Sequence, residues 1–274
     1  HRDLHYPLRR QRQMCIRDSN ITNDSFSDEG KFLEPSTSFD YINQMIKDGC
    51  KIIDIGAEST RQSFQQVSDD IQIQSIVPVI EYILSHHKDI EISIDTRSSF
   101  VAQECLRKGV KMINDVSSGS DDMMFDIIKD HNAEIILTHM PEEHLMGKNM
   151  NSVNIINDLT NYFDSKISHA LRVGINEEKI IIDPGIGFGK KGNDNLLILN
   201  NLELFVKKFN RVCIGVSNKR FSSKIFSSLA DDKLRFVNLA VTTLAAYKRV
   251  EFVRVHSISD NYDACKIAHK TLNS

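Results

Sequence analysis

Residues 179–190 read KIIIDPGIGFGK, in which a short run of isoleucines ends at Asp183 and a glycine-rich loop follows. A short run rich in isoleucine and valine is typical of a strand buried on both faces of a parallel sheet. The same pattern, a short apolar run at or near a polar residue, recurs along the chain. The other candidate strands are residues 51–55, 91–95, 110–115, 134–138, 211–216 and 251–256.

Longer segments with apolar residues at helical spacing separate these runs. They cover residues 68–87, 152–173, 194–208, 231–249 and 259–272. Pro78 lies inside the first segment and is expected to kink it, because proline cannot donate to the helical ladder. Alternating strands and helices predict a parallel sheet with right-handed crossovers. With 274 residues and no internal repeat or linker, the chain fits one α/β domain, a (β/α)8 TIM barrel.

The eighth strand of such a barrel should precede Asn20, where the sequence has a different character. Residues 1–18 contain five arginines but neither the apolar core of a signal peptide nor the serines of a transit peptide. The string QRQMCIRDS resembles translated sequencing-adaptor read-through, and a genuine basic extension is the alternative. We therefore expect residues 1–19 to be non-native or disordered, and residues 20–274 to form a barrel with a damaged or replaced first strand. The strands at 51–55 and 251–256 would then have unpaired edges, and stability would fall.

Composition and charge argue against several classes of function. A net charge of -3 gives no strongly basic face for nucleic acid. The five cysteines form no CxxC pair, which favours buried thiols in a reducing cytoplasm over disulfides or a zinc site. No run of 18 apolar residues occurs, so no transmembrane helix and no membrane partner are expected. His139 and His144 flank Pro141 and are not expected to bind metal, and Lys190 and Lys191 are expected to be solvated.

Polar residues occupy the same position in nearly every strand–helix unit. Those at or just past a strand end are Asp54, Asp95, Asn114, Asp183, Ser217 and His256, and Asn20 follows the expected first strand. A single such residue usually caps a helix, but in a barrel these ends converge on one face, and several in register favour an active site. A buried carboxylate there can accept two parallel N–H bonds from a guanidine-like ring edge. Arg61, Lys219 and Arg254 supply positive charge for an anion, and Arg254 could instead stack on an aromatic ligand.

Seven stretches together resemble the dihydropteroate synthase family. They are NITNDSFSDEG (20–30), IIDIGAESTR (52–61), SIDT (93–96), INDVSSG (113–119), IIDPGIGFGK (181–190), IGVSNKR (214–220) and RVHS (254–257). The resemblance implies a folate-pathway transferase that condenses 6-hydroxymethyl-7,8-dihydropterin diphosphate with 4-aminobenzoate, assisted by Mg2+. It also implies a homodimer and a family targeted by sulfonamides.

The resemblance also implies roles for individual residues. The pterin ring would be held by Asp95, Asn114, Asp183 and Lys219, with Asp183 at its 2-amino and N3 edge and Arg254 stacked on it. The diphosphate would be surrounded by Asn20, Arg61, Arg254 and His256, with Asn20 nearest Mg2+ and with Thr60 and Asp54 shaping the region. The aminobenzoate would be walled by Phe26, Phe188 and the loop around Arg61, and its carboxylate met by Lys219 and Arg220. Arg61, Lys219, Arg254 and His256 are the expected catalytic residues, and no general base is assigned.

The chain departs from the family pattern at three places. Gln62 and Ser63 replace the usual Pro-Gly, Asn218 replaces an arginine, and Asn23 replaces a proline. The first two concern the aminobenzoate pocket rather than the pterin pocket. Two other functions stay open: a pterin-binding methyltransferase domain, which would not need Arg61 and His256, and a non-catalytic pterin-binding paralogue or gene fragment.

Overall fold

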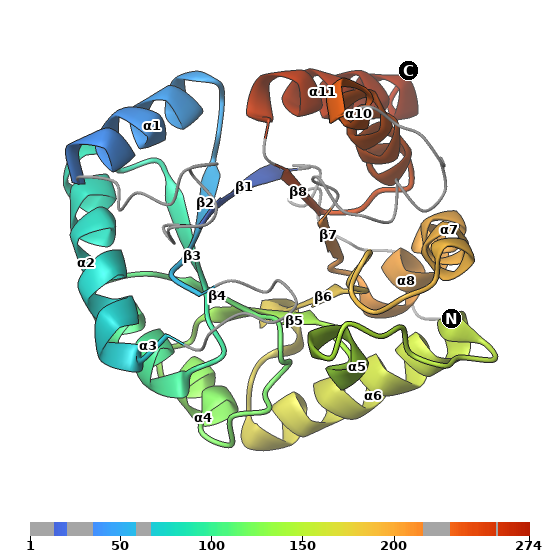
Figure 1. Ribbon diagram of the computed structural model, residues 1–274, viewed down its shortest axis with the longest axis horizontal. Coiled ribbons are helices and arrows are strands. Elements are labelled where there is room, and N and C mark those ends of the chain that lie inside the picture. The colour runs from blue at the N-terminus through green and yellow to red at the C-terminus, as the bar shows by residue number, and fades with distance from the viewer. Residues whose placement is uncertain (1–13, 21–34, 59–66, 216–230, 256) are drawn as a thin grey trace.

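The structure is a computed structural model that describes residues 14–20, 35–58, 67–215, 231–255 and 257–274. At its centre is an eight-stranded sheet in which every named pair of neighbouring strands is parallel. The strands are β1 (Met14–Asn20), β2 (Ile52–Gly56), β3 (Glu91–Asp95), β4 (Met112–Asp115), β5 (Glu134–Thr138), β6 (Ile180–Asp183), β7 (Cys213–Gly215) and β8 (Phe252–Val255). Figure 1 shows the strands at the centre and the helices arranged around them.

The sheet closes into a ring. Its strand order, β6-β5-β4-β3-β2-β1-β8-β7, leaves β6 and β7 as the two ends. A parallel bridge from Ile182 of β6 to Val212, just before β7, joins these ends. The backbone N–H of Ile182 also donates to the carbonyl of Arg211 at 3.1 Å. The expected (β/α)8 barrel is therefore confirmed.

Helices follow the strands along the chain. They are α1 (Pro35–Lys47), α2 (Asp69–His86), α3 (Ser99–Arg107), α4 (Met124–Asp130), α5 (Glu142–Leu145), α6 (Ile155–Val173), α7 (Gly192–Asn200), α8 (Leu202–Phe209), α10 (Asp231–Tyr247) and α11 (Ile258–Leu272), with a 3-10 turn, η2 (Glu177–Lys179). Helix α2 continues through Pro78, so this proline does not end it, and the expected kink stays a prediction. The single helix expected at 194–208 is divided into α7 and α8. Among the described residues, no helix has the length and apolar character needed to cross a membrane.

Side chains on each strand alternate between the helices and the barrel interior. Outward-facing residues such as Ile53, Ile113 and Val253 belong to the large core shared with the helices. A separate cluster fills the barrel interior, and we call it the apolar floor: Ile52, Met112, Ile136, Ile181, Cys213 and Phe252. Two positions further along β2, β4, β6 and β8, the next inward residue is polar. The barrel therefore has a filled apolar interior beneath a polar layer at the C-terminal strand ends, as is usual for this fold.

The first strand differs from expectation. β1 pairs with β2 from Ile16↔Ile52 to Asn20↔Gly56, and with β8 from Met14↔Phe252 to Arg17↔Val255. The unpaired edges expected on both neighbours are therefore wrong. Backbone pairing is open to any residue with a free N–H and carbonyl, so charged side chains do not prevent it. Whether residues 1–19 are native is a separate matter, and that expectation stays a prediction.

A buried arginine fastens the opposite end of the barrel. The Arg211 guanidinium bonds both oxygens of Glu251, its Nη1 lies 3.1 Å from Glu134 Oε1, and the same atom donates to the carbonyl of Glu178 at 2.7 Å. These partners stand at or just before the N-terminal ends of β5, β6 and β8. Burial alone would lower the pKa of Arg211, but the two carboxylates outweigh it and raise that pKa. This network belongs to the side of the barrel that usually provides stability.

Candidate active site

Four strand-end residues form one buried ion cluster inside the barrel. Arg254 of β8 places Nη2 3.2 Å from Asp183 Oδ2 of β6 and 3.2 Å from Asn114 Oδ1 of β4. Its Nη1 lies 3.6 Å from Asp54 Oδ2 of β2. The amide nitrogen of Asn114 donates to the same oxygen of Asp54 at 3.0 Å. All four residues are buried, so the structure brings these predicted residues together, and we call them the Arg254 cluster.

Opposite charges hold this cluster. Burial alone would lower the pKa of the Arg254 guanidinium, but the carboxylates of Asp54, Asp183 and Asp95 outweigh it and raise that pKa. The guanidinium therefore stays protonated. Burial raises the pKa of the Cys213 thiol to about 12, so the thiol stays neutral.

Asp95 lies beside the cluster at the end of β3. Its backbone is in register with Gly56 of β2 and with Asn114 of β4. Its charge contributes to the field around Arg254, but Asp95 is partly exposed, unlike the two carboxylates of the cluster. We conclude that Asp95 lies nearer the mouth of the barrel.

The loop after β6 fixes the direction of Asp183. The N–H of Gly185 donates to Asp183 Oδ1 at 2.8 Å, while the other carboxylate oxygen faces Arg254. Gly185 has a φ of +67°, and a Cβ there would lie 2.0 Å from the carbonyl oxygen of His139. A side chain at this position would therefore clash with the backbone. Further along the loop, the half-exposed Phe188 packs edge-on against His144, with ring centroids 5.0 Å apart.

Several polar atoms near the cluster are buried without a hydrogen-bond partner among the described residues. They are Arg254 Nε, Ser93 Oγ and Thr138 Oγ1. Thr138 is in register with Asp183, and Ser93 is in register with Asp54. Buried polar groups in native proteins are normally satisfied, so these atoms indicate a place for water or a polar ligand.

A second set of polar contacts follows β2. Glu58, just past β2, receives bonds from Arg97 Nη2 at 2.6 Å and from the N–H of Val67 at 3.4 Å. Residues 58 and 67 bound the segment 59–66, so this one carboxylate contacts both sides of the segment. Sequence reasoning did not single out Glu58 or Arg97. Their positions in IIDIGAESTR and just after SIDT would have been the signal.

Several predicted site residues lie outside the described residues. They are Phe26, Thr60, Arg61, Ser217, Lys219, Arg220 and His256. Asn20 ends β1 with its backbone in register with Gly56, and its side chain is likewise not described. The roles given to these residues stay predictions.

The expectation that Lys190 is solvated is wrong. Lys190 is 1% exposed, and its ammonium donates to the backbone carbonyls of His139, Gly185 and Phe188. Lys191 is exposed, as expected. The sequence alone does not distinguish the buried Lys190 from the exposed Lys191, because Lys190 is buried by the path that the glycine loop takes around it.

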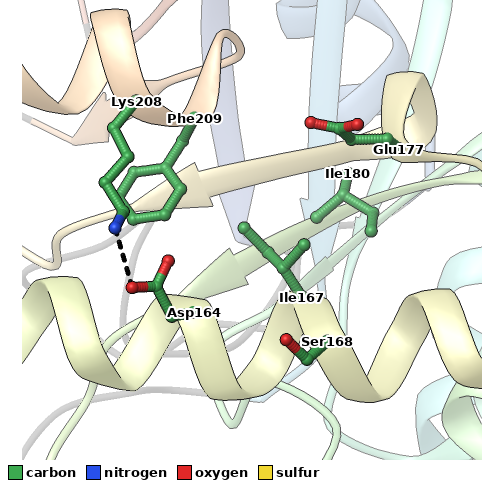
Figure 2. Close-up of a pocket in the computed structure, with 7 residues that line it drawn as sticks. All are labelled: Asp164, Ile167, Ser168, Glu177, Ile180, Lys208 and Phe209. Carbon is green, nitrogen blue, oxygen red and sulfur yellow. Dashed lines mark hydrogen bonds and ion pairs between the residues drawn. The ribbon is translucent and has the colours of Figure 1, made fainter.

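A small hollow elsewhere contains none of the predicted site residues. Figure 2 shows it between α6 and α8, close to the start of β6 and with the Asp164–Lys208 ion pair at its edge. Its volume is about 150 Å³, and it is lined by Asp164, Ile167, Ser168, Glu177, Ile180, Lys208 and Phe209. Because Ile180 begins β6 and Asp183 ends it, the hollow lies toward the opposite end of the barrel from the Arg254 cluster.

The fold and the strand-end cluster can be compared with known proteins. The family model described as pterin binding enzyme matches residues 18–256, which is most of the chain and includes the whole Arg254 cluster. The class defined by fold and site is therefore that of the pterin-binding enzymes.

The relatives identify the family within that class. The dihydropteroate synthase of Bacillus subtilis is 34% identical over 255 residues, covering 93% of this chain and 87% of the relative. That of Streptococcus pyogenes serotype M6 is 36% identical over 248 residues, covering 89% and 90%. A dihydropteroate synthase crystal structure from Clostridium difficile, in the presence of pteroic acid, superposes with a TM-score of 0.88 at 30% identity, covering 97% and 98% of the two chains. The chain belongs to the dihydropteroate synthase family.

Proposed function

We propose that the chain condenses 6-hydroxymethyl-7,8-dihydropterin diphosphate with 4-aminobenzoate, giving 7,8-dihydropteroate and diphosphate in folate biosynthesis. The relatives support this reaction by name. Structures from Xanthomonas albilineans, 26% and 25% identical to this chain, contain 4-aminobenzoic acid and 7,8-dihydropteroate. The observation that carries the proposal is the Arg254 cluster, a buried carboxylate and amide beneath the C-terminal face of the barrel.

The cluster suits the hydrogen-bonding edge of a pterin. That edge offers an amino group and a neighbouring ring N–H, two parallel donors that match the two oxygens of a carboxylate. In the structure, the donor at Asp183 Oδ2 is the flat guanidinium of Arg254, 3.2 Å away. The carboxylate therefore already accommodates a planar group of N–H donors. Asn114 adds an acceptor and a donor beside it.

The reaction needs positioning and charge more than proton transfer. The amine nitrogen of 4-aminobenzoate attacks the pterin CH2, the C–O bond to the diphosphate breaks, and the amine releases one proton. An aromatic amine is mostly neutral at pH 7, so no strong base has to activate it. Negative charge grows on the departing diphosphate, and cations placed nearby stabilise it. We assign this role to Arg254 together with Arg61, Lys219 and His256.

We also propose Mg2+ as the metal cofactor, with Asn20 as a ligand. Asn20, Gly56 and Asp95 lie in one backbone row across the ends of β1, β2 and β3. An amide and a carboxylate at these strand ends have the oxygen-donor chemistry that Mg2+ takes, and the diphosphate would complete the set. When bound, the ion supplies positive charge to the leaving group.

The remaining predicted residues complete the proposed site. Thr60 would shape the diphosphate region with Asp54. Phe26 and Phe188 would wall the aminobenzoate pocket, and Lys219 and Arg220 would meet its carboxylate. Phe188 supports this placement, because it is partly exposed on the loop whose Gly185 N–H bonds the Asp183 carboxylate.

Diphosphate release tests the proposed function. We expect release from pterin diphosphate only when both Mg2+ and 4-aminobenzoate are present, with dihydropteroate formed in equal amount. Pterin binding without release would favour a non-catalytic paralogue. Pterin binding with methyl transfer to a corrinoid, and no diphosphate release, would favour the methyltransferase domain.

We further propose a homodimer in the cytoplasm. Exposed large apolar side chains on neighbouring helices support self-association. They are Leu196 and Leu197 on α7, Leu204 on α8, and Phe236, Leu244 and Tyr247 on α10. The four cysteines whose side chains are described form no disulfide, in keeping with a reducing compartment. Light scattering of the wild type and of Phe236→Glu tests the dimer, and a monomeric wild type at micromolar concentration would contradict it.

A further inference from the structure

Lys190 has a place in the fold that neither its sequence context nor the proposed chemistry explains. It follows the glycine loop and directly precedes the exposed Lys191. We infer that Lys190 is a positioning residue, whose buried ammonium fixes the loop 184–190 against the end of β5 and so sets Asp183 and Phe188. This inference rests on the proposed function, because Asp183 and Phe188 matter through the substrates that they would contact.

The ammonium ties two segments together. Its Nζ donates to the carbonyl of Gly185 at 2.8 Å, of His139 at 3.1 Å and of Phe188 at 3.2 Å. His139 follows β5, whereas Gly185 and Phe188 belong to the loop after β6. Three acceptors match the three N–H donors of a protonated lysine, while a neutral amine has two. The side chain is therefore held in its charged form at the junction of the two segments.

The same junction controls Asp183. The N–H of His139 donates to the backbone carbonyl of Asp183 at 2.9 Å, and the N–H of Gly185 donates to its carboxylate at 2.8 Å. Lys190 bonds the carbonyl oxygens of both of these residues. Releasing the ammonium would free both peptide segments that hold Asp183, and it would leave three carbonyl oxygens close together without their shared donor.

Other side chains hold the rest of the loop, so Lys190 completes a set of anchors. The N–H of Gly187 donates to Asn195 Oδ1 at 2.8 Å, and the N–H of Gly189 donates to His144 Nδ1 at 3.1 Å. These anchors engage N–H groups, whereas Lys190 engages carbonyls. Phe188 lies between them, and its carbonyl is one of the three that Lys190 holds.

The positive charge of Lys190 changes the pKa of a neighbouring histidine. Burial and then the charge of Lys190 lower the pKa of His139 to about 3, so that histidine stays neutral. The loop is thus closed around one buried cation. Since a purely apolar side chain could fill the same volume, the charge and its three donors are the properties to test.

The test compares Lys190→Met with Lys191→Met in the full chain. Methionine keeps the aliphatic stem of Lys190 and removes the ammonium. The control removes the exposed neighbour, whose Nζ contacts Asn151 at 3.3 Å. We expect Lys190→Met to raise the calorimetric Kd for pterin diphosphate about tenfold or more and to raise its KM in parallel, with Lys191→Met within about twofold of wild type.

This pattern separates positioning from simple structural support. A merely structural role lowers kcat through loss of folded enzyme and leaves KM unchanged, and a folded Lys190→Met with wild-type Kd and KM would overturn the inference. If Lys190→Met does not fold, Lys190→Gln replaces it, because glutamine keeps two N–H donors without charge. We expect an intermediate rise in Kd, and a wild-type Kd in that variant would overturn the inference equally.

Amide exchange keeps the inference distinct from the proposed function. The N–H groups of Gly185, Gly187 and Gly189 should exchange faster in Lys190→Met than in wild type, with or without substrate. If the wild type fails to bind pterin diphosphate, the proposed function fails. Unchanged amide exchange in Lys190→Met would instead reject the inference that Lys190 fixes the loop 184–190.

Discussion

Replacing Asp183 by asparagine separates the pterin contact from the fold. Asparagine has the same shape, and its carbonyl oxygen can keep the bond from the Gly185 N–H, 2.8 Å from Asp183 Oδ1. Its amino group then faces Arg254 Nη2, where Asp183 Oδ2 now accepts at 3.2 Å. A pterin edge would meet one acceptor and one donor instead of two acceptors. We therefore expect Asp183→Asn to fold and to bind pterin weakly.

The loss of affinity can be worked out from hydrogen bonds to charged groups. Each is worth about 1.5–3 kcal/mol, so two bonds from the pterin edge contribute about 3–6 kcal/mol. Asp183 already accepts one such bond, from Arg254, and pterin binding has to replace it. The net loss is then about 1.5–3 kcal/mol, or roughly a 10- to 150-fold rise in Kd. In the variant, the amino group of the asparagine would face an N–H group of the pterin, and this repulsion places the expected rise in Kd toward the upper end of that range.

The assay is calorimetric titration with the pterin diphosphate, alongside a denaturant unfolding curve. Asp115→Asn is a matched control. Asp115 is another buried carboxylate at a strand end, but it follows the inward-facing Asn114, and its oxygens accept from the N–H groups of Ser117 at 2.8 Å and Gly119 at 2.6 Å. The control should lower stability and leave pterin affinity unchanged. Wild-type affinity in a folded Asp183→Asn would refute the assignment of Asp183.

Three further outcomes follow from the structure. Arg211→Met should lower the free energy of unfolding by about 3 kcal/mol, because Glu251 and Glu134 lose their partner. The pterin Kd should stay unchanged, and a changed Kd in calorimetry would contradict the separation of the two barrel ends. Gly185→Ala should lower stability by at least about 1–2 kcal/mol from its φ of +67° alone, and it should also weaken pterin binding. Thermal melting and titration measure the two effects. A melting curve like that of wild type would count against the clash with His139. The folded pKa of His139, about 3, lies below its unfolded value of 6.5, so between these values the unfolded state holds the extra proton and stability falls as pH decreases. His139→Phe should flatten the pH dependence of unfolding from pH 6.5 to 4.5 by about 2–3 kcal/mol relative to wild type, and identical slopes would reject that cause.

Much of the fold could be predicted because buried parallel strands have a distinct composition. The runs at 91–95 and 134–138 match β3 and β5, and the other runs overlap their strands, with ends that differ by at most two residues. Helices α3 and α4, with nine and seven residues, are too short to give a clear apolar stripe. The break between α7 and α8 follows from Asn201, whose amide nitrogen donates to the carbonyl of Leu197 at 2.8 Å and competes with the helical ladder.

The candidate site could be predicted only where chemistry follows strand position. Asp54, Asn114, Asp183 and Arg254 lie within two residues of the C-terminal ends of parallel strands, and the barrel brings such ends together whatever the loops do. Lys190 could not be predicted in this way. Its burial depends on three backbone carbonyls from two segments about 50 residues apart in the chain, and carbonyl positions have no signature in the sequence.

The apolar floor also decides how molecules reach the Arg254 cluster. Floor residues such as Cys213 and Phe252 fill the interior beneath the cluster, and Arg211 fastens the far end, so in the described part of the chain access runs through the strand-end face. Because both substrates enter through the same face, they have to bind in a fixed order. A pterin seated at Asp183 lies deepest and has to enter first, and an aminobenzoate near Phe188 would then stand between it and solvent. We therefore expect 4-aminobenzoate to bind weakly alone and more tightly once the deeper place is filled, and the joined product to leave as one piece.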